Sequence, residues 1–336
     1  MGVSETTSIA SDIYQGLMEN GRRYFVAHLL SNNQCLPSPQ IPESHVPADE
    51  QMFEAYESCH VMLLTLDSHN KNPLFYAPVD EPKTEQHILD IGTGKGSWAI
   101  DVADLFPDTT VRGVDLFPPP ETWIPPNCIL EVDDILQDWT WRDPFDLIHL
   151  RILENAFTPE QTDRLYKLCY DHTAPGGWIE QFEISAFFEC DDNSLTEDSV
   201  LRVWGPKLTR AARKSGRKSG IMHTMQGSME KAGFTDIHVK NYKLPVGPWP
   251  RDKQLKEAGT ANFHHWTEGM EGYCMWLMTR YGEPAPWSME EVVVYTAEVR
   301  KEISNPQNHC YQRARRIWAR KPGGSTEPKI KSEPSP

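Results

Sequence analysis

The amino-acid sequence predicts an α/β fold built around a mostly parallel sheet. Apolar runs alternate with helical patterns from residue 86 to about residue 190, a glycine-rich turn follows the first run, and an acid stands at the end of each of the first three. Runs of this kind are typical of buried strands, and the helices between them are the crossovers that parallel strands need. With 39% hydrophobic residues, the 336-residue chain can form a packed core.

The expected strands are seven short apolar segments, five in the alternating region and two late in the chain. They are Ile88–Ile91, Val111–Val114, Ile129–Val132, Phe145–Leu150, Trp178–Ile184, Ile237–Leu244 and Cys310–Trp318. Before the sheet, apolar side chains from Asp49 to Leu66 recur near helical spacing, which predicts a helix there.

Composition divides the chain into four parts. Residues 1–48 are expected to be a flexible segment, 49–85 a helical cap, 86–321 the main domain with a lid insertion at about 245–305, and 322–336 a disordered tail. Gly2 fits a loose myristoylation pattern, and Lys331 lies in a four-residue pattern that resembles an attachment site for the modifier SUMO. Both patterns are short and arise often by chance.

Charge and cysteine usage exclude several classes of protein. The formal net charge is −15, which argues against binding nucleic acid through phosphate contacts, because such binding needs a basic face. The seven cysteines include no CxxC pair, which favours reduced thiols in an intracellular protein over a zinc site or a disulfide framework. The sequence has no secretory signal, no apolar stretch long enough to span a bilayer and no metal-ligand spacing among its histidines, so neither secretion nor a metal is expected.

The glycine turn "LDIGTGKGSW" fits two kinds of cofactor site. A dinucleotide fingerprint needs a third glycine where Ser97 or Ala99 stands, which weakens that interpretation without excluding it. The alternative pattern, D-x-G-x-G-x-G, fits from Asp90 through Gly92 and Gly94 to Gly96. A carboxylate at Asp90 would attract the ammonium group of S-adenosylmethionine (SAM) and repel a pyrophosphate. Helix N–H groups after the turn could meet the carboxylate of SAM.

Two further acids predict where a nucleoside would lie. Asp115 ends the second strand, where a carboxylate can accept hydrogen bonds from both ribose hydroxyls. Asp134 follows the third strand and could accept from the adenine amine, while the backbone N–H of Ile135 meets a ring nitrogen. The predicted cofactor site also includes two neighbours of these groups, Thr93 in the turn and Leu116 after the second strand.

The combination of motifs resembles the fungal LaeA-like methyltransferases. The resemblance rests on "LDIGTGKGSWAIDVADLFPDTTVRGVDL", "WIPPNCILEVDDILQDWTW", "FDLIHLR", "PGGWIEQFE", "AGFTDIHV" and "PVGPWPRD", and it extends in order from about Asp49 to Pro322. It departs from the family at Lys95, where relatives usually carry threonine. Because the Lys95 side chain can point away from the turn, we expect cofactor binding to survive.

The resemblance implies a class I SAM-dependent methyltransferase fold, with seven strands in a Rossmann-like sheet and SAM as cofactor. The last two strands are then expected to pair antiparallel, and the insertion between them to be helical and to cover the active site together with residues 49–66. The family includes enzymes that modify secondary metabolites. It also includes regulators of development and secondary metabolism that bind velvet-family proteins, so a cytoplasmic or nuclear location is expected.

Methyl transfer requires only an aligned nucleophile and, for a hydroxyl or amine, removal of a proton, so several side chains are candidates for the catalytic residue. His149 and Arg151, after the fourth strand, are the leading candidates, and His149 is expected to lie nearest the transferred methyl group. Glu180 and Glu183 are expected on opposite faces of the fifth strand. The remaining candidates are His223, His264 and His265.

Three functions therefore remain open at this stage. The chain is expected to be a SAM-dependent methyltransferase that regulates development or secondary metabolism within a protein complex. The alternatives are an O- or N-methyltransferase acting on a small metabolite, and a SAM-binding partner protein with little catalysis. The intact set of Asp90, Asp115 and Asp134 favours SAM binding in all three.

Overall fold

The computed structural model describes residues 16–25, 44–79 and 86–323. Its main sheet contains seven strands in the order β5-β4-β3-β6-β7-β9-β8. The strands are β3 (Gln86–Ile91), β4 (Thr109–Asp115), β5 (Cys128–Val132), β6 (Phe145–Arg151), β7 (Thr173–Glu189), β8 (Thr235–Pro245) and β9 (Tyr311–Arg320). The first five are parallel, and β9 runs antiparallel to both β7 and β8. The predicted seven-stranded, mostly parallel sheet and the antiparallel last pair are confirmed.

The strand order places the glycine turn at the centre of the sheet. β3 lies between β4 and β6, and the chain winds outward from it in both directions. The carboxyl ends of parallel strands diverge at such a point and leave a crevice, which is where open α/β sheets bind ligands. The turn that follows β3 and the acid that ends β4 therefore lie at the mouth of this crevice.

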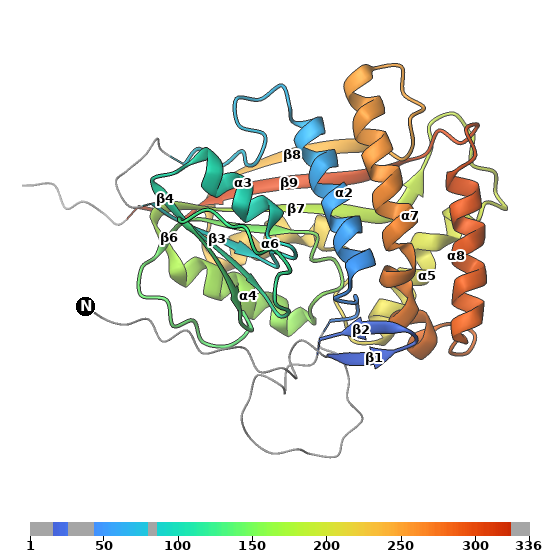
Figure 1. Ribbon diagram of the computed structural model, residues 1–336, viewed down its shortest axis with the longest axis horizontal. Helices are drawn as coiled ribbons and strands as arrows, with labels where there is room; N and C mark the ends of the chain where they lie inside the picture. Colours follow the sequence, from blue (N-terminus) through green and yellow to red (C-terminus); the bar gives the residue numbers. More distant parts are fainter. Residues whose placement is uncertain (1–15, 26–43, 80–85, 324–336) are drawn as a thin grey trace, which may run out of the picture.

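Helices lie on both faces of the sheet (Figure 1). α3 (Ser97–Leu105) packs on β4 and β5, whereas α4 (Pro159–His172) and α6 (Ile221–Ala232) contact each other and β7. α5 (Val200–Lys214) follows β7 and packs against it. α4 begins with a capping box, in which the Thr158 hydroxyl and the Gln161 side chain each accept a backbone N–H of the other residue.

The insertion between β8 and β9 is helical, as predicted. It consists of α7 (Lys253–Tyr281) and α8 (Met289–Ile303). α7 runs beside α2 (Glu50–Leu66), the predicted N-terminal helix, and the two helices make extensive contact (Figure 1). Asp49 and Asp252 cap the starts of α2 and α7 by accepting backbone N–H groups from Met52 and Leu255.

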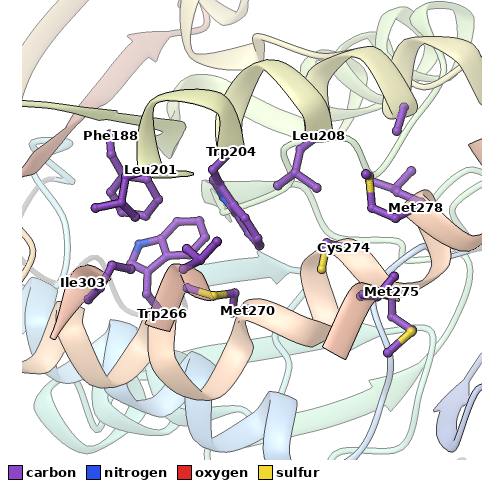
Figure 2. Close-up of a cluster of buried hydrophobic side chains, with 14 of the residues drawn as sticks. Phe188, Leu201, Trp204, Leu208, Trp266, Met270, Cys274, Met275, Met278 and Ile303 are labelled. Atoms are coloured by element: carbon purple, nitrogen blue, oxygen red, sulfur yellow. The ribbon is translucent and has the colours of Figure 1, made fainter. Parts of the chain in front are cut away.

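A buried aromatic cluster fixes α7 between α5 and α8. Figure 2 shows Trp204 of α5 and Trp266 of α7 pointing toward one another, and their rings meet edge to face with centroids 6.0 Å apart. Trp204 also stacks on Tyr295 of α8. Because all three rings come from different helices, this cluster holds the inserted helices as a unit against the end of the sheet.

The first part of the chain contains a hairpin that the sequence analysis missed. β1 (Leu17–Glu19) and β2 (Arg22–Tyr24) pair antiparallel within the segment expected to be flexible. Arg22 donates two hydrogen bonds to the carboxylate of Asp49, and Glu19 pairs with Arg280 at the end of α7. The expectation of flexibility is therefore wrong for this stretch, because ion pairs and the buried Tyr24 attach it to both α2 and α7.

Several predictions concern residues outside the described part of the chain. These are Gly2, Lys331 and the predicted disordered tail from residue 324 onward, together with residues 1–15 and 26–43 of the predicted flexible segment.

Candidate functional site

A cavity lies at the carboxyl ends of β3, β4 and β5 and is roofed by α2 and α7. Seven of the predicted cofactor residues line it: Gly92, Thr93, Gly94, Asp115, Leu116, Asp134 and Ile135. Arg151 also lines it, whereas Asp90, Gly96 and His149 are absent from its wall. The roof contributes Tyr56, His265, Trp266 and Tyr273. The cavity therefore joins the predicted cofactor site to the inserted helices.

The glycine turn requires glycine because its backbone is left-handed at three positions. Gly92, Gly94 and Gly96 have φ values of +72°, +59° and +93°, which residues with a Cβ rarely adopt. A Cβ on Gly96 would also lie only 2.8 Å from a methyl group of Leu130. The turn thus presents bare backbone to the cavity, which allows a ligand to approach closely.

Asp90 lies beneath this turn instead of in the cavity. Its two carboxylate oxygens accept hydrogen bonds from the Thr93 hydroxyl and from Nδ1 of His149, each at 2.7 Å. Only 3% of Asp90 is exposed. The carboxylate thus faces inward, where these two donors hold it, and it fixes the shape of the turn. Contact between Asp90 and the ammonium of SAM, directly or through water, stays a prediction.

His149 occupies a similar inner position. It is 1% exposed and stacks on Trp98, with ring centroids 3.7 Å apart. Burial lowers the pKa of His149 in spite of the adjacent Asp90 carboxylate. Because the ring is enclosed by Trp98 and Asp90, its position does not suit the predicted role of a catalytic base beside the methyl group. It is suited instead to orienting Asp90.

Asp115 and Asp134 lie on the cavity wall at neighbouring strand ends. Asp115 accepts a hydrogen bond from the backbone N–H of Gly94 at 2.9 Å, and burial raises its pKa to about 6. Asp134 accepts from the backbone N–H of Leu136 at 3.0 Å, which shapes the loop after β5. Both carboxylates retain acceptor capacity toward the cavity, because a carboxylate has about four lone-pair sites.

The roof presents a histidine whose tautomer is fixed. Nδ1 of His265 lies 2.8 Å from the carbonyl oxygen of Ala55, so this nitrogen carries the proton and donates it. The other ring nitrogen, Nε2, is then an acceptor, 3.3 Å from the hydroxyl of Tyr273. Burial lowers the pKa of His265 to about 4, so the ring is neutral at physiological pH. Among the histidine candidates, His265 is the one placed on the cavity wall, since His264 and His223 are exposed.

The remaining candidates have structural partners. Glu180 and Glu183 are both buried. In the register with β9 they stand opposite Trp318 and Arg315, three residues apart, so they lie on opposite faces of β7, as predicted from their spacing. Glu180 pairs with Arg316, whereas one oxygen of Glu183 accepts the backbone N–H of Leu153. These contacts place both glutamates in the support behind the cavity.

Arg151 contacts a residue that the sequence analysis did not single out. Its Nη1 lies 3.1 Å from Nδ1 of His60 on α2, and Nε2 of His60 lies 2.9 Å from Asp101 on α3. Glu154, three residues after Arg151, accepts the backbone N–H groups of Gly220 and Ile221 at the start of α6. No local signal in the sequence links His60 to Arg151, because 91 residues separate them.

Comparisons with known proteins agree with this architecture. Residues 55–239 match the family model of a methyltransferase domain. The secondary metabolism regulator LAE1 of Cochliobolus heterostrophus is 36% identical, with 82% of this chain and 89% of that protein covered. The chain belongs to the LaeA-like methyltransferases. The regulator laeA of Aspergillus niger is 33% identical over 83% of this chain and 72% of its own length, and the methyltransferase pytC of Aspergillus terreus is 32% identical over 91% and 88%.

Membership in this family establishes a SAM-dependent methyltransferase with SAM as its cofactor, which resolves the choice left open by the glycine turn. The cavity suits this cofactor, because bare backbone at Gly94 lies beside the carboxylate of Asp115. In the described part of the chain, no helix is long and apolar enough to cross a membrane. Within the same residues, no group of three or more potential ligands is arranged to hold a metal ion.

Proposed function

We propose that this methyltransferase regulates fungal development or secondary metabolism from within a protein complex. The main support is its similarity to proteins named secondary metabolism regulators, at 36% and 33% identity over most of both chains. The cavity has the glycine turn, the acids Asp115 and Asp134, and a roof of helices α2 and α7. Together these features favour a role that uses methyl transfer over a role as a binding partner alone.

In this proposal the cofactor lies along the carboxyl edge of the sheet. Asp115 would accept from the ribose hydroxyls, and Asp134 with the N–H of Ile135 would bind the adenine edge, since these residues line neighbouring parts of one wall. The turn from Gly92 to Gly94 would face the methionine part. Asp90 and His149 would support the turn from behind, through the hydrogen bonds to Thr93 and between each other.

The bound cofactor supplies an electrophilic methyl group that passes in line to a nucleophile, with a neutral thioether as leaving group. The chain must then orient the acceptor and take up its proton. His265 is the proposed group for this step, because its Nε2 has a lone pair at the cavity wall and its Nδ1 is anchored on Ala55. The Tyr273 hydroxyl can occupy Nε2 until an acceptor replaces it.

The regulatory role implies protein partners. Velvet-family proteins are the proposed ones, on the resemblance to velvet-binding methyltransferases, and the proposed location is the cytoplasm, the nucleus or both. The net charge of −15 is compatible with an approach to chromatin through a partner and not through direct contact with DNA.

A second candidate function is methylation of a small secondary metabolite. Two observations favour it: the acceptor end of the cavity is roofed by α7 through His265, Trp266 and Tyr273, and one relative over most of the chain is the methyltransferase pytC. A roofed cavity admits a small molecule or an extended side chain more readily than a folded protein surface.

Labelled SAM distinguishes the two functions. Purified protein is incubated with radiolabelled SAM and a fungal extract, and proteins are separated from small molecules before counting. Label in a protein band that is absent with His265→Ala supports the regulatory proposal, and label in a small-molecule fraction supports the second. If neither fraction is labelled while the protein binds SAM, both catalytic proposals are wrong.

A further inference from the structure

Arg151 is a cation at the cavity wall without a carboxylate partner among residues 16–25, 44–79 and 86–323. Its one hydrogen bond there runs from Nη1 to a ring nitrogen of His60. Two buried arginines are matched by acids: Arg22 by Asp49, and Arg316 by both Asp67 and Glu180. Arg151 is half-buried, and a guanidinium that is partly withdrawn from water gains from charge-assisted hydrogen bonds to an anionic partner.

The partner of Arg151 is a neutral ring. A guanidinium can only donate hydrogen bonds, so Nδ1 of His60 must be the acceptor and its proton must be on Nε2. That proton points to Asp101, 2.9 Å away. Asp101 therefore acts on Arg151 only across the imidazole ring. The Nε and Nη2 donors of Arg151 are left for another acceptor.

The position of Arg151 favours a ligand beside the glycine turn. Leu150 pairs with Ile91 across β6 and β3, so Arg151 lies next to Gly92 at the ends of these strands. The start of α3, where the sequence analysis expected the carboxylate of SAM, is already occupied by an acid. The hydroxyl of Ser97 donates to the carboxylate of Glu57 at 2.5 Å. A second carboxylate there would be repelled by Glu57.

We propose that Arg151 binds a carboxylate group in the cavity by the paired N–H geometry that guanidinium groups offer. This inference rests on the proposed cofactor site. The carboxylate can come from the methionine part of SAM or from the methyl acceptor. His60 is a positioning residue in both cases, because it orients the guanidinium from α2 and does not line the cavity.

Calorimetry with SAM and with decarboxylated SAM tests the first source. If SAM supplies the carboxylate, Arg151→Gln should bind SAM at least tenfold more weakly than the unchanged protein does. Decarboxylated SAM should bind both proteins equally. Arg313→Gln is the control, because it removes an exposed arginine paired with Glu189 and should leave both affinities unchanged. If the unchanged protein fails to bind SAM at all, the proposed cofactor site is wrong, which is a different failure.

Titration with succinate tests the second source. Protein saturated with S-adenosylhomocysteine is titrated with this dicarboxylate, and Arg151→Gln should lose at least tenfold in affinity if the acceptor supplies the carboxylate. Arg151→Lys keeps the positive charge but lacks the paired N–H groups of the guanidinium, so it should bind whichever of SAM or succinate depends on Arg151 with intermediate affinity. Arg151→Lys also replaces Arg151→Gln in these titrations if Arg151→Gln does not fold. The proposal is overturned if Arg151→Gln changes neither the preference for SAM over decarboxylated SAM nor the binding of succinate.

Discussion

Nδ1 of His149 lies 2.7 Å from Oδ1 of Asp90, and the other oxygen of Asp90 holds the hydroxyl of Thr93. A residue buried on β6 thereby fixes the glycine turn that lines the cavity. The two residues are direct neighbours in register across β3 and β6, which explains how a strand interior can control a loop.

Replacing His149 by Phe should destabilise the protein and weaken cofactor binding together. The Phe ring can keep the stacking on Trp98, but it leaves Oδ1 of Asp90 buried without a donor, which costs about 1–3 kcal/mol. Urea unfolding measures the first effect, and titration with S-adenosylhomocysteine measures the second. His238→Phe, at an exposed histidine, is the control. Unchanged stability and affinity in His149→Phe would show that His149 does not support the turn.

Replacing Glu183 by Gln should stabilise the protein as the pH rises. Burial raises the pKa of Glu183 to about 8, and its Oε2 has no hydrogen-bond partner among the described residues. Between the ordinary carboxyl value and about 8, the folded state holds a proton that the unfolded state loses, so stability falls as pH rises through this range. The gain from Glu183→Gln should therefore be absent near pH 4 and largest above pH 8.

The opposite result is expected for Glu180→Gln, the matched change on the other face of β7. It removes a charge that contacts Arg316, and breaking a buried pair costs about 3 kcal/mol or more. Urea unfolding of both variants at pH 5, 7 and 8.5 checks the contrast. Similar effects of the two substitutions would contradict the account in which Glu180 forms an ion pair and Glu183 does not.

Cofactor affinity should decline in acid because of Asp115. Burial raises the pKa of this carboxyl to about 6, so it loses its charge as the pH falls through 6. A protonated carboxyl accepts hydrogen bonds from ribose hydroxyls poorly. Calorimetry with S-adenosylhomocysteine from pH 5 to 8 should show weaker binding below 6, and Asp115→Asn should bind weakly with no such trend. A trend that persists in Asp115→Asn would assign it to another group.

Gly113→Ala should distort the glycine turn, because Gly113 on β4 packs directly against Thr93. A Cβ on Gly113 would lie 2.6 Å from the Thr93 hydroxyl and 2.8 Å from Leu130, and overpacking of this kind costs about 1–3 kcal/mol. Both thermal stability and affinity for S-adenosylhomocysteine should fall. Gly227→Ala in α6 meets nothing within 4 Å and should be neutral or stabilising, since alanine favours helix. Equal melting temperatures for the two variants would contradict the close packing under Thr93.

The sheet could be predicted from the sequence, and seven of the predicted cofactor residues line one cavity, because both depend on local patterns. Apolar runs mark buried strands. An acid that directly follows such a run lies at the carboxyl end of its strand, whatever the rest of the chain does. The contact of His265 with Ala55 spans 210 residues, and that of Arg151 with His60 spans 91. No periodicity encodes such contacts, so they required the structure. The direction in which Asp90 points was missed for the same reason, since it depends on His149 across a strand pair.

The most direct test of the central claim is calorimetric titration of the protein with S-adenosylhomocysteine and, separately, with NAD. We predict binding of S-adenosylhomocysteine, no binding of NAD, and at least a tenfold loss in Asp115→Ala, equivalent to about 1.4 kcal/mol. Tight binding of NAD, or an unchanged affinity for S-adenosylhomocysteine in Asp115→Ala, would contradict the placement of the cofactor at the carboxyl ends of β3 and β4.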